Sequence, residues 1–342
     1  MIRVASRSTA LAAFVSFVSF VSFLYLVSFA SLASAQTRTA FPEKRGLQLS
    51  QFPRVIKLAE NVYGYEEIRD PGMTTVSMFV VGRDGVLLVD GQGSVEATKK
   101  LVDAIAKTAP GKPIKWYVVG SDHGDHTAGN SALPANVTYI ISPASLKQMQ
   151  ADAENARAAA EKAKAEATAK GGAAPASRPP VIVPPTAMTG DKQVVDVGGI
   201  EAQVLYLGRA HTGGDLSVYL PKQKILFMSE AYLNRVFPAM RSAYPTEWVK
   251  VVDRALAMDV ERYIPGHGFI EEPKASREEL VEYQKAMKYV IGEVQRLHKL
   301  GLSADDARKQ ANWGPYKDWM LADQQDIIAI RKVYEEIEGK LK

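Results

Sequence analysis

Cysteine is absent from the 342-residue sequence, and histidine occurs only five times. The absence of cysteine excludes disulfide bonds, a thiolate nucleophile, iron–sulfur clusters and zinc sites with cysteine ligands. No charge is in large excess either: 42 Lys and Arg against 38 Asp and Glu give a net charge of +4. Because the basic residues are scattered, the sequence has no nucleic-acid-binding footprint. Its 46% hydrophobic and 23% charged residues exclude a wholly disordered, collagen-like or multi-span membrane chain.

The first 35 residues have the pattern of a secretory signal peptide. Arg3 and Arg7 precede an uncharged, largely apolar stretch, Ser8–Ala35, which ends in the small-residue sequence Ala33-Ser34-Ala35. We therefore predict cleavage and export of residues 36–342 to a bacterial periplasm or the exterior, with no stable membrane association afterwards. The competing interpretation is an uncleaved membrane anchor, because the apolar stretch is longer than most signal-peptide cores.

Two strand-rich blocks, each with a helix, follow this segment. Amphipathic helices are predicted at 94–108, with Ser94 as N-cap, and at Thr246–Met258. The β-rich runs lie at Val76–Val81, Val86–Asp90, Ile114–Gly120, Val137–Ile141, Gln193–Val197, Ala202–Leu207, Leu216–Leu220, Ile225–Met228 and Tyr263–Ile264. Two such blocks predict an α/β sandwich of two mixed β-sheets covered by helices, which we assign to residues 36–270.

An insertion and a carboxyl-terminal extension complete the predicted organisation. Residues 145–185 contain an Ala-, Lys- and Glu-rich helix and a Pro-rich return. The insertion is open to three interpretations: a solvated arm, a lid over the site, or a contact in a homodimer. Residues 271–342 are predicted to be a helical extension packed on the same domain. Its helix starts are expected at a capping box, Ser276-x-x-Glu279, at Ser303 and near Leu321.

Four of the five histidines are predicted to lie in loops at strand ends, beside Gly or Pro. Two of them follow a strand in Ser121-Asp122-His123-Gly124-Asp125-His126. His211 precedes a strand, and His267 follows one in Pro265-Gly266-His267-Gly268. Neutral imidazole and carboxylate are ligands that suit zinc and comparable divalent metals. The pattern therefore predicts a metal site, whereas His298, near the end of a long helix, is expected to have a surface role.

Together with Glu230, these residues resemble the metallo-β-lactamase superfamily. The family pattern is His-x-His-x-Asp-His, a later His, a bridging acid after a strand, and a final His in a Pro-Gly-His-Gly-like loop. The resemblance covers about Val62 to Ile270 and implies a four-layer αβ/βα sandwich with the metal site at one edge between the sheets. Two positions depart from the pattern. Ser121 stands at the first motif histidine, and Glu230 replaces the usual bridging aspartate.

The resemblance implies two metal positions. Asp125, His126 and His267 supply the second position completely, whereas the first retains only His123 and His211. Ser121 offers a neutral oxygen at best, and Glu230 either bridges two ions or serves the second position alone. The implied cofactor is zinc, as one or two ions, with manganese or iron(II) as alternatives.

The resemblance also implies hydrolysis by a metal-bound hydroxide. Asp125 is the predicted catalytic residue, which orients the water and moves its proton. Acceptors for the second ring nitrogens of the ligand histidines are predicted at Asp122 and Asp215. Contacts to a small-molecule substrate are predicted at Ser121, Arg235, Phe237, Arg241 and Tyr244. For Phe237 and Tyr244, packing against the next helix is the alternative.

The function predicted from the sequence is that of an exported metal-dependent hydrolase acting on an ester, lactone or related acyl bond. A β-lactamase in the strict sense is one alternative, and a chromogenic cephalosporin assay separates the two. The other alternative is a metal-binding or accessory protein that keeps the fold without turnover, and Ser121 is the feature that leaves it open.

Overall fold

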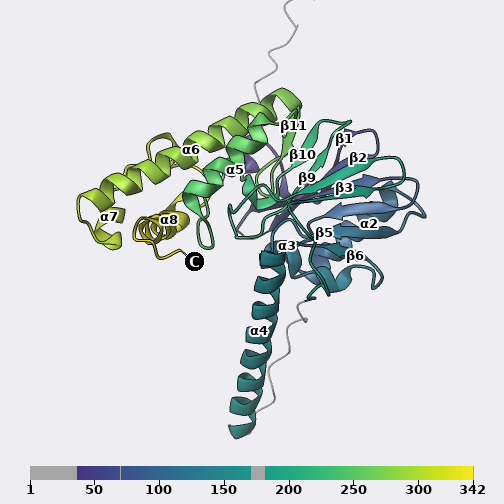
Figure 1. The fold of residues 1–342 in the computed structure, drawn as a ribbon, viewed down its shortest axis with the longest axis horizontal. Coiled ribbons are helices and arrows are strands. Elements are labelled where there is room, and N and C mark those ends of the chain that lie inside the picture. Colours follow the sequence, from purple (N-terminus) through teal and green to yellow (C-terminus); the bar gives the residue numbers. More distant parts are fainter. Residues whose placement is uncertain (1–36, 70, 171–181, 342) are drawn as a thin grey trace, which may run out of the picture. The chain divides into compact units, whose positions relative to one another are not determined.

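The computed structural model describes residues 37–69, 71–170 and 182–341 (Figure 1). The predicted signal peptide and part of the Pro-rich return lie outside the described residues. The chain divides into two units, Met1–Thr37 and Arg38–Lys342, and every element named below belongs to the second. Among the described helices, none combines the length and the apolarity needed to cross a membrane.

The first sheet has six strands in the order β1-β2-β3-β4-β5-β6. They span Arg54–Ala59 (β1), Val62–Arg69 (β2), Met73–Val81 (β3), Val86–Val89 (β4), Ile114–Val118 (β5) and Thr138–Ile140 (β6). The first four strands are antiparallel neighbours joined by short turns, whereas β4, β5 and β6 are parallel. Parallel neighbours need a crossover, and a helix supplies it between β4 and β5.

The second sheet has five strands in the order β11-β10-β9-β8-β7. They span Lys192–Asp196 (β7), Glu201–Leu205 (β8), Ser217–Leu220 (β9), Ile225–Phe227 (β10) and Arg262–Ile264 (β11). Only the β10–β11 pair is parallel. Buried side chains of both sheets, among them Met78, Val118, Val204 and Phe227, form one core between them. The predicted sandwich of two mixed sheets is confirmed.

Helices cover the outer faces of both sheets (Figure 1). Helix α2 (Val95–Thr108) packs Leu101 and Ile105 on the first sheet, and the Ser94 hydroxyl caps it by accepting a bond from the Ala97 amide at 3.1 Å. Helices α5 (Pro245–Ala257) and α6 (Pro273–Lys299) share a second core with Leu226 and Tyr263 of the second sheet. The predicted four layers are therefore present.

The remaining helices are short or belong to the insertion and the extension. They are α3 (Gly124–Thr127), α4 (Pro143–Ala169), α7 (Ala304–Gln310) and α8 (Ala322–Ile337), with 3₁₀ turns η1 (Glu43–Arg45), η2 (Leu49–Gln51), η3 (Asn130–Ala132), η4 (Ser229–Ala231) and η5 (Gly314–Tyr316). Helix α8 contacts α6, α7 and α5, so the carboxyl-terminal extension packs on the sandwich.

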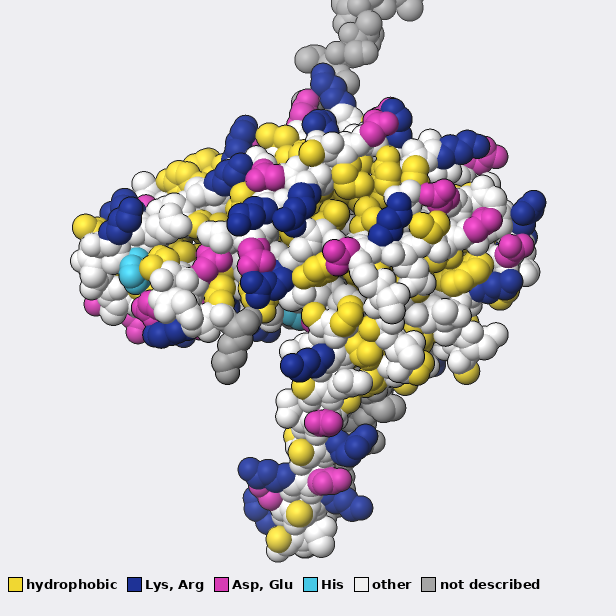
Figure 2. Space-filling model, viewed as in Figure 1, with side chains coloured by type: hydrophobic (Ala, Val, Ile, Leu, Met, Phe, Trp, Pro, Cys, Tyr) yellow, Lys and Arg dark blue, Asp and Glu magenta, His cyan; other side chains and the backbone are white. Residues whose placement is uncertain are grey.

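Helix α4 forms the predicted helical part of the insertion. It begins after Ser142, whose hydroxyl accepts a bond from the Ser145 amide at 3.1 Å, and only Ser145 and Met149 on it are buried. Figure 2 shows charged side chains of both signs around its far end. The helix is therefore held at its first turns, and the rest relies on the strong helix propensity of Ala, Lys and Glu.

Two local predictions differ from the structure. Strands β1 and β2 were not predicted, because buried Glu66 interrupts the apolar alternation of β2; Arg54 of β1 pairs with it at 2.6 Å. The capping box at Ser276 is wrong, since α6 already begins at Pro273. The Ser276 hydroxyl instead donates to the Pro273 carbonyl and accepts from the Tyr263 amide. The helix start at Ser303 is confirmed by its bond from the Asp306 amide.

Candidate metal centre and substrate cavity

The ends of four strands bring the candidate site together. The carboxyl ends of the parallel strands β4 and β5 lead to Asp90 and to the segment 121–127, and those of β10 and β11 lead to Glu230 and His267. His211 comes from the loop before β9. The predicted loop after β5 is in part helical: α3 starts at Gly124, directly after His123. Each sheet thus delivers its polar side chains at one edge.

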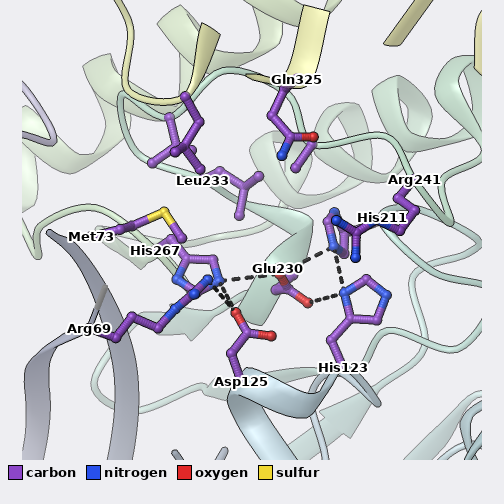
Figure 3. Close-up of a pocket in the computed structure, with 13 residues that line it drawn as sticks. Arg69, Met73, His123, Asp125, His211, Glu230, Leu233, Arg241, His267 and Gln325 are labelled. Carbon is purple, nitrogen blue, oxygen red and sulfur yellow. Dashed lines mark hydrogen bonds and ion pairs between the residues drawn. The ribbon is translucent and has the colours of Figure 1, made fainter. Parts of the chain in front are cut away.

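The donor atoms fall into two groups that share one carboxylate. One group is Asp125, His126, Glu230 and His267, and the other is His123, His211 and Glu230; within each group the donor atoms lie within 4.8 Å of one another. Figure 3 shows the Glu230 carboxylate between the groups. Its Oε1 lies 3.2 Å from Nε2 of both His211 and His267, and its Oε2 lies 3.1 Å from Nδ1 of His123.

The tautomers of His126 and His267 test whether these residues fit a metal ion. Nδ1 of His267 donates to the Thr74 carbonyl at 2.6 Å, and Nδ1 of His126 lies 3.1 Å from a carboxylate oxygen of Asp90. With a proton on each Nδ1, the two Nε2 lone pairs face each other at 3.3 Å. Such lone pairs repel unless a proton or metal ion stands near both. Because Asp125 and Glu230 add negative charge to this group, a divalent ion fits best.

The carboxylates of the site are held in their ionised form. Burial opposes ionisation of Glu230, but the imidazoles of His211 and His123 outweigh it and keep the pKa of Glu230 well below its ordinary value. For Asp125, burial and the Glu230 charge raise the pKa. The hydrogen bond from His267 and the charges of His126 and His267 lower it by more, so the pKa of Asp125 is below its ordinary value. Both side chains therefore present negative oxygen ligands at neutral pH.

Ser121 lies behind Glu230 and does not reach the cavity. Its side chain is fully buried, and its hydroxyl donates to Oε2 of Glu230 at 2.6 Å. The residue at the first motif position therefore holds the shared carboxylate, and its predicted contact with substrate is not what the structure shows.

Replacing Ser121 by alanine is expected to weaken zinc binding about 10- to 100-fold, because Glu230 loses the donor that orients it. Competition with a chromogenic chelator measures the affinity. Ser242→Ala is the matched control, since its exposed hydroxyl only approaches Nε2 of His123 at 3.3 Å. An unchanged affinity in Ser121→Ala would show that Glu230 is positioned without this bond.

Asp90 and the Thr74 carbonyl face the second ring nitrogens of His126 and His267. This role was predicted for Asp122 and Asp215. The buried Nδ1 of His211 has no hydrogen-bond partner among the described residues. The Asp90 carboxylate faces His126 and accepts bonds from the Gly120 amide and the Ser229 hydroxyl. Asp215 instead accepts from the Thr212 amide and hydroxyl, which shapes the His211 loop. Neither predicted aspartate accepts a hydrogen bond from a ligand histidine within the described part of the chain. The sequence signal was Asp90 itself, a charged residue closing the buried strand 86–89.

A glycine fixes the loop that carries His267. Gly268 has φ +85°, and a β-carbon there would lie 2.0 Å from the Asn234 carbonyl oxygen. Gly268→Ala is therefore expected to lower the free energy of unfolding by about 3 kcal/mol, through both the left-handed backbone and the clash. Gly190→Ala separates the two causes, because φ is +71° there and no atom lies within 4 Å; it should cost about 1 kcal/mol. Urea unfolding measures both, and equal losses would contradict the clash.

A cavity of about 260 Å³ opens over the two ligand groups. Its lining residues are Arg69, Met73, His123, Asp125, His211, Glu230, Leu233, Val236, Ala239, Arg241, His267, Leu321 and Gln325. Among the predicted substrate contacts, only Arg241 lines it. Figure 3 shows Arg69 beside Asp125, and Nη2 of Arg69 lies 2.7 Å from Oδ2 of that carboxylate. Arg69 and the apolar lining residues Met73, Leu233, Val236, Ala239 and Leu321 were not predicted from the sequence.

The other predicted substrate contacts have structural partners. Phe237 is fully buried and meets Trp313 edge to face, with ring centroids 5.4 Å apart. Arg235 forms a two-bond pair with Glu279 of α6. The guanidinium carbon of Arg209 lies over the Tyr244 ring, 4.1 Å from the ring centroid. These contacts of Phe237 and Tyr244 are thus with Trp313 and Arg209, not with the following helix α5 that the alternative named, and Arg235 is engaged in an ion pair.

A sequence model of the metallo-beta-lactamase superfamily matches residues 70–267, which include every candidate ligand. The chain belongs to this superfamily. The first of two curated relatives is the 2,4-dinitroanisole O-demethylase subunit alpha of Nocardioides sp. (strain JS1661), 23% identical over 62% of this chain and 62% of that protein. The second is the linear primary-alkylsulfatase of Pseudomonas sp., 24% identical over 76% of this chain and 43% of that protein.

Solved structures show the same fold. The sec-alkylsulfatase Pisa1 from Pseudomonas sp. superposes with a TM-score of 0.63 over 86% of this chain and 52% of that one, at 16% identity. A metallo-beta-lactamase from Pontibacter korlensis superposes with a TM-score of 0.53 over 69% of this chain and 98% of that one, at 18% identity. The predicted family and fold are confirmed. This superfamily member spans less than two thirds of the length of either curated relative.

Proposed function

We propose that this protein is a metal-dependent hydrolase that cleaves an ester or related bond in a small molecule, with zinc as its metal. The observation that carries the proposal is the pair of ligand groups that share Glu230 at the floor of a cavity. The curated relatives are named as enzymes, one a sulfatase and one an O-demethylase, which supports turnover over a binding role.

The ligand count supports two ions. Asp125, His126, His267 and Glu230 make four ligands for one ion, and His123, His211 and Glu230 make three for the other. Three protein ligands with an open position are typical of catalytic zinc. When bound, the metal supplies Lewis acidity and makes water a nucleophile at neutral pH.

Asp125 is the residue proposed to handle the proton of the attacking water. Arg69 and His267 both contact its Oδ2, at 2.7 and 3.1 Å. The carboxylate is thus fixed at one oxygen, and its other oxygen, Oδ1, is left to orient a water and accept its proton. The Asp125 side chain is 21% exposed and lines the cavity, so a water in the cavity can reach Oδ1.

A substrate panel on zinc-loaded protein tests the proposal. Hydrolysis of 4-nitrophenyl carboxylic esters, a lactone, 4-nitrophenyl sulfate and a chromogenic cephalosporin is followed with and without a chelator. We expect chelator-sensitive hydrolysis of an ester, restored by zinc. Cleavage of the cephalosporin alone would identify a β-lactamase instead. Chelator-insensitive or absent turnover on the whole panel would contradict the proposal.

Export belongs to the same proposal, since the signal-peptide pattern of residues 1–35 implies it. Amino-terminal sequencing of the protein recovered from the periplasmic and extracellular fractions tests it. A mature end at Gln36 is expected, and an intact Met1 in the membrane fraction would favour the uncleaved anchor.

A further inference from the structure

Part of the cavity wall comes from the carboxyl-terminal extension. Leu321 directly precedes α8, and Gln325 lies in the first turn of that helix. Both line the cavity, and Figure 3 shows Gln325 on the side away from Asp125. The extension therefore completes a site whose candidate metal ligands all come from the sandwich.

Backbone bonds hold this part of the extension in place. The segment after Glu230 pairs with it: the Phe237 amide donates to the Met320 carbonyl at 2.9 Å, and the Met320 amide donates to the Arg235 carbonyl at 3.2 Å. Leu321 directly follows, with φ +65°, a conformation that L-residues with a β-carbon disfavour. The surrounding bonds thus fix a leucine at a backbone position better suited to glycine or asparagine, facing the cavity.

The wall beside the extension is apolar. Leu233, Val236 and Ala239 come from the segment after Glu230, and Met73 lies beside His267 (Figure 3). With Leu321 they make a continuous set of aliphatic and thioether side chains on one side of the cavity. Such a wall favours an apolar group of the ligand.

Arg241 gives the opposite character at the His123 side of the rim. Arg241 lies in the turn Met240–Ala243. The hydroxyl of the neighbouring Ser242 lies 3.3 Å from Nε2 of His123. The exposed guanidinium of Arg241 makes no ion pair or hydrogen bond with any described residue, whereas Arg69 and Arg235 each contact a carboxylate. The side-chain amide of Gln325 likewise has no hydrogen-bond partner within the described ranges, whereas its backbone amide donates to the Leu321 carbonyl at 2.9 Å. A cation and an amide are therefore available to a ligand.

We infer that the substrate is a small amphiphilic anion. Its negative group pairs with Arg241, its apolar group packs against Leu321, Leu233 and Val236, and Gln325 hydrogen-bonds a polar atom of it. The extension thus selects the substrate by its apolar part. This inference rests on the proposed function, because a bound anion is a substrate only if the protein hydrolyses it. Binding of the anion itself depends on the cavity alone.

Calorimetric titration of the zinc-loaded protein with linear alkanesulfonates of two to eight carbons tests this recognition. Affinity should rise with each methylene until the wall is covered, by at most about fourfold per methylene. Leu321→Ala should reduce this gain, and Leu321→Met, which restores the apolar volume, should recover it. Gln324→Ala is the matched control for Gln325→Ala, because Gln324 is exposed on the same turn. Thermal unfolding confirms that each variant is folded.

Arg241→Gln tests the charge separately. It should weaken sulfonate binding about tenfold and leave the binding of primary alcohols of equal length unchanged. The inference would be overturned if the increase in affinity per methylene were the same in Leu321→Ala as in the unchanged protein. It would also be overturned if Arg241→Gln bound the sulfonates as tightly as the unchanged protein does. Binding with the expected dependence on Leu321 and Arg241, in a protein that hydrolyses nothing on the substrate panel, would support the recognition and contradict the hydrolase proposal.

Discussion

Asp125→Asn is expected to lower kcat for the hydrolysed substrate about 10²- to 10⁴-fold, the usual contribution of a positioned proton acceptor. The amide keeps the size of the side chain and one oxygen, so folding should be unaffected. It cannot accept the proton of the attacking water, and it loses the ion pair with Arg69. Steady-state kinetics together with the metal content of the same preparation measures the effect.

Asp122→Asn is the matched control for this variant. Asp122 lies three residues earlier and is buried, and burial raises the pKa of its carboxyl. The neutral amide therefore replaces a carboxylate that is costly to ionise, and kcat should change by less than about threefold, as for a site outside the proton transfer. Full activity and full metal content in Asp125→Asn would remove Asp125 from the mechanism.

Glu230→Gln is expected to abolish the binding of both ions and, with it, turnover. Glu230 is the one residue common to both ligand groups, and its carboxylate oxygens lie within 3.2 Å of ring nitrogens of His123, His211 and His267. The affinity loss should exceed the roughly 10- to 100-fold loss seen when only an outer hydrogen-bond partner is changed. Mass spectrometric metal analysis after gel filtration, with a parallel rate assay, measures it.

Glu66→Gln provides the control for removing a buried carboxylate elsewhere. Glu66 is fully buried and pairs with Arg54 away from the metal groups. This variant should unfold at a lower temperature and keep its metal, whereas Glu230→Gln should lose metal first. Retention of two ions by Glu230→Gln would show that the groups do not depend on a shared carboxylate.

The candidate histidines and Asp125 were accessible from local sequence patterns, whereas Glu230 was identified only through the resemblance to the superfamily. Residues 123–126 and His267 lie in loops at the carboxyl ends of parallel strands, where side chains converge at one edge of a sheet, and His211 lies in the loop before β9. The capping serines, Ser94 and Ser303, were predictable for the same reason: an N-cap is a property of four consecutive residues.

The cavity wall was not accessible, because its members come from distant segments without a local signature. Leu321 reads as an ordinary apolar helix residue, and only the bonds between Met320 and Phe237 place it over the site. Phe237 shows the opposite case: an aromatic residue near the site that faces the core. Apolar side chains serve cores and cavities alike, so only the tertiary fold distinguishes them.

Buried charged residues were the other reason why parts of the fold and the site could not be predicted from the sequence. Strand β2 was not predicted because Glu66, a charged residue in a buried position, interrupts the alternation of apolar and polar residues expected of a strand. The bond that Glu66 accepts from the Ile270 amide at 2.7 Å, together with Arg54, makes the burial tolerable. Asp90 was assigned to the end of a strand and its role toward His126 was missed, because the pairing joins positions 36 residues apart.

The metal content of the purified protein tests the central claim most directly. Mass spectrometry after gentle purification, and again after incubation with zinc, manganese or iron(II), gives ions per chain. Two ligand groups that share Glu230 predict a content close to two, falling in His211→Ala and in His267→Ala. A content near zero that no added metal restores would contradict the account and leave a protein that keeps the fold without the chemistry.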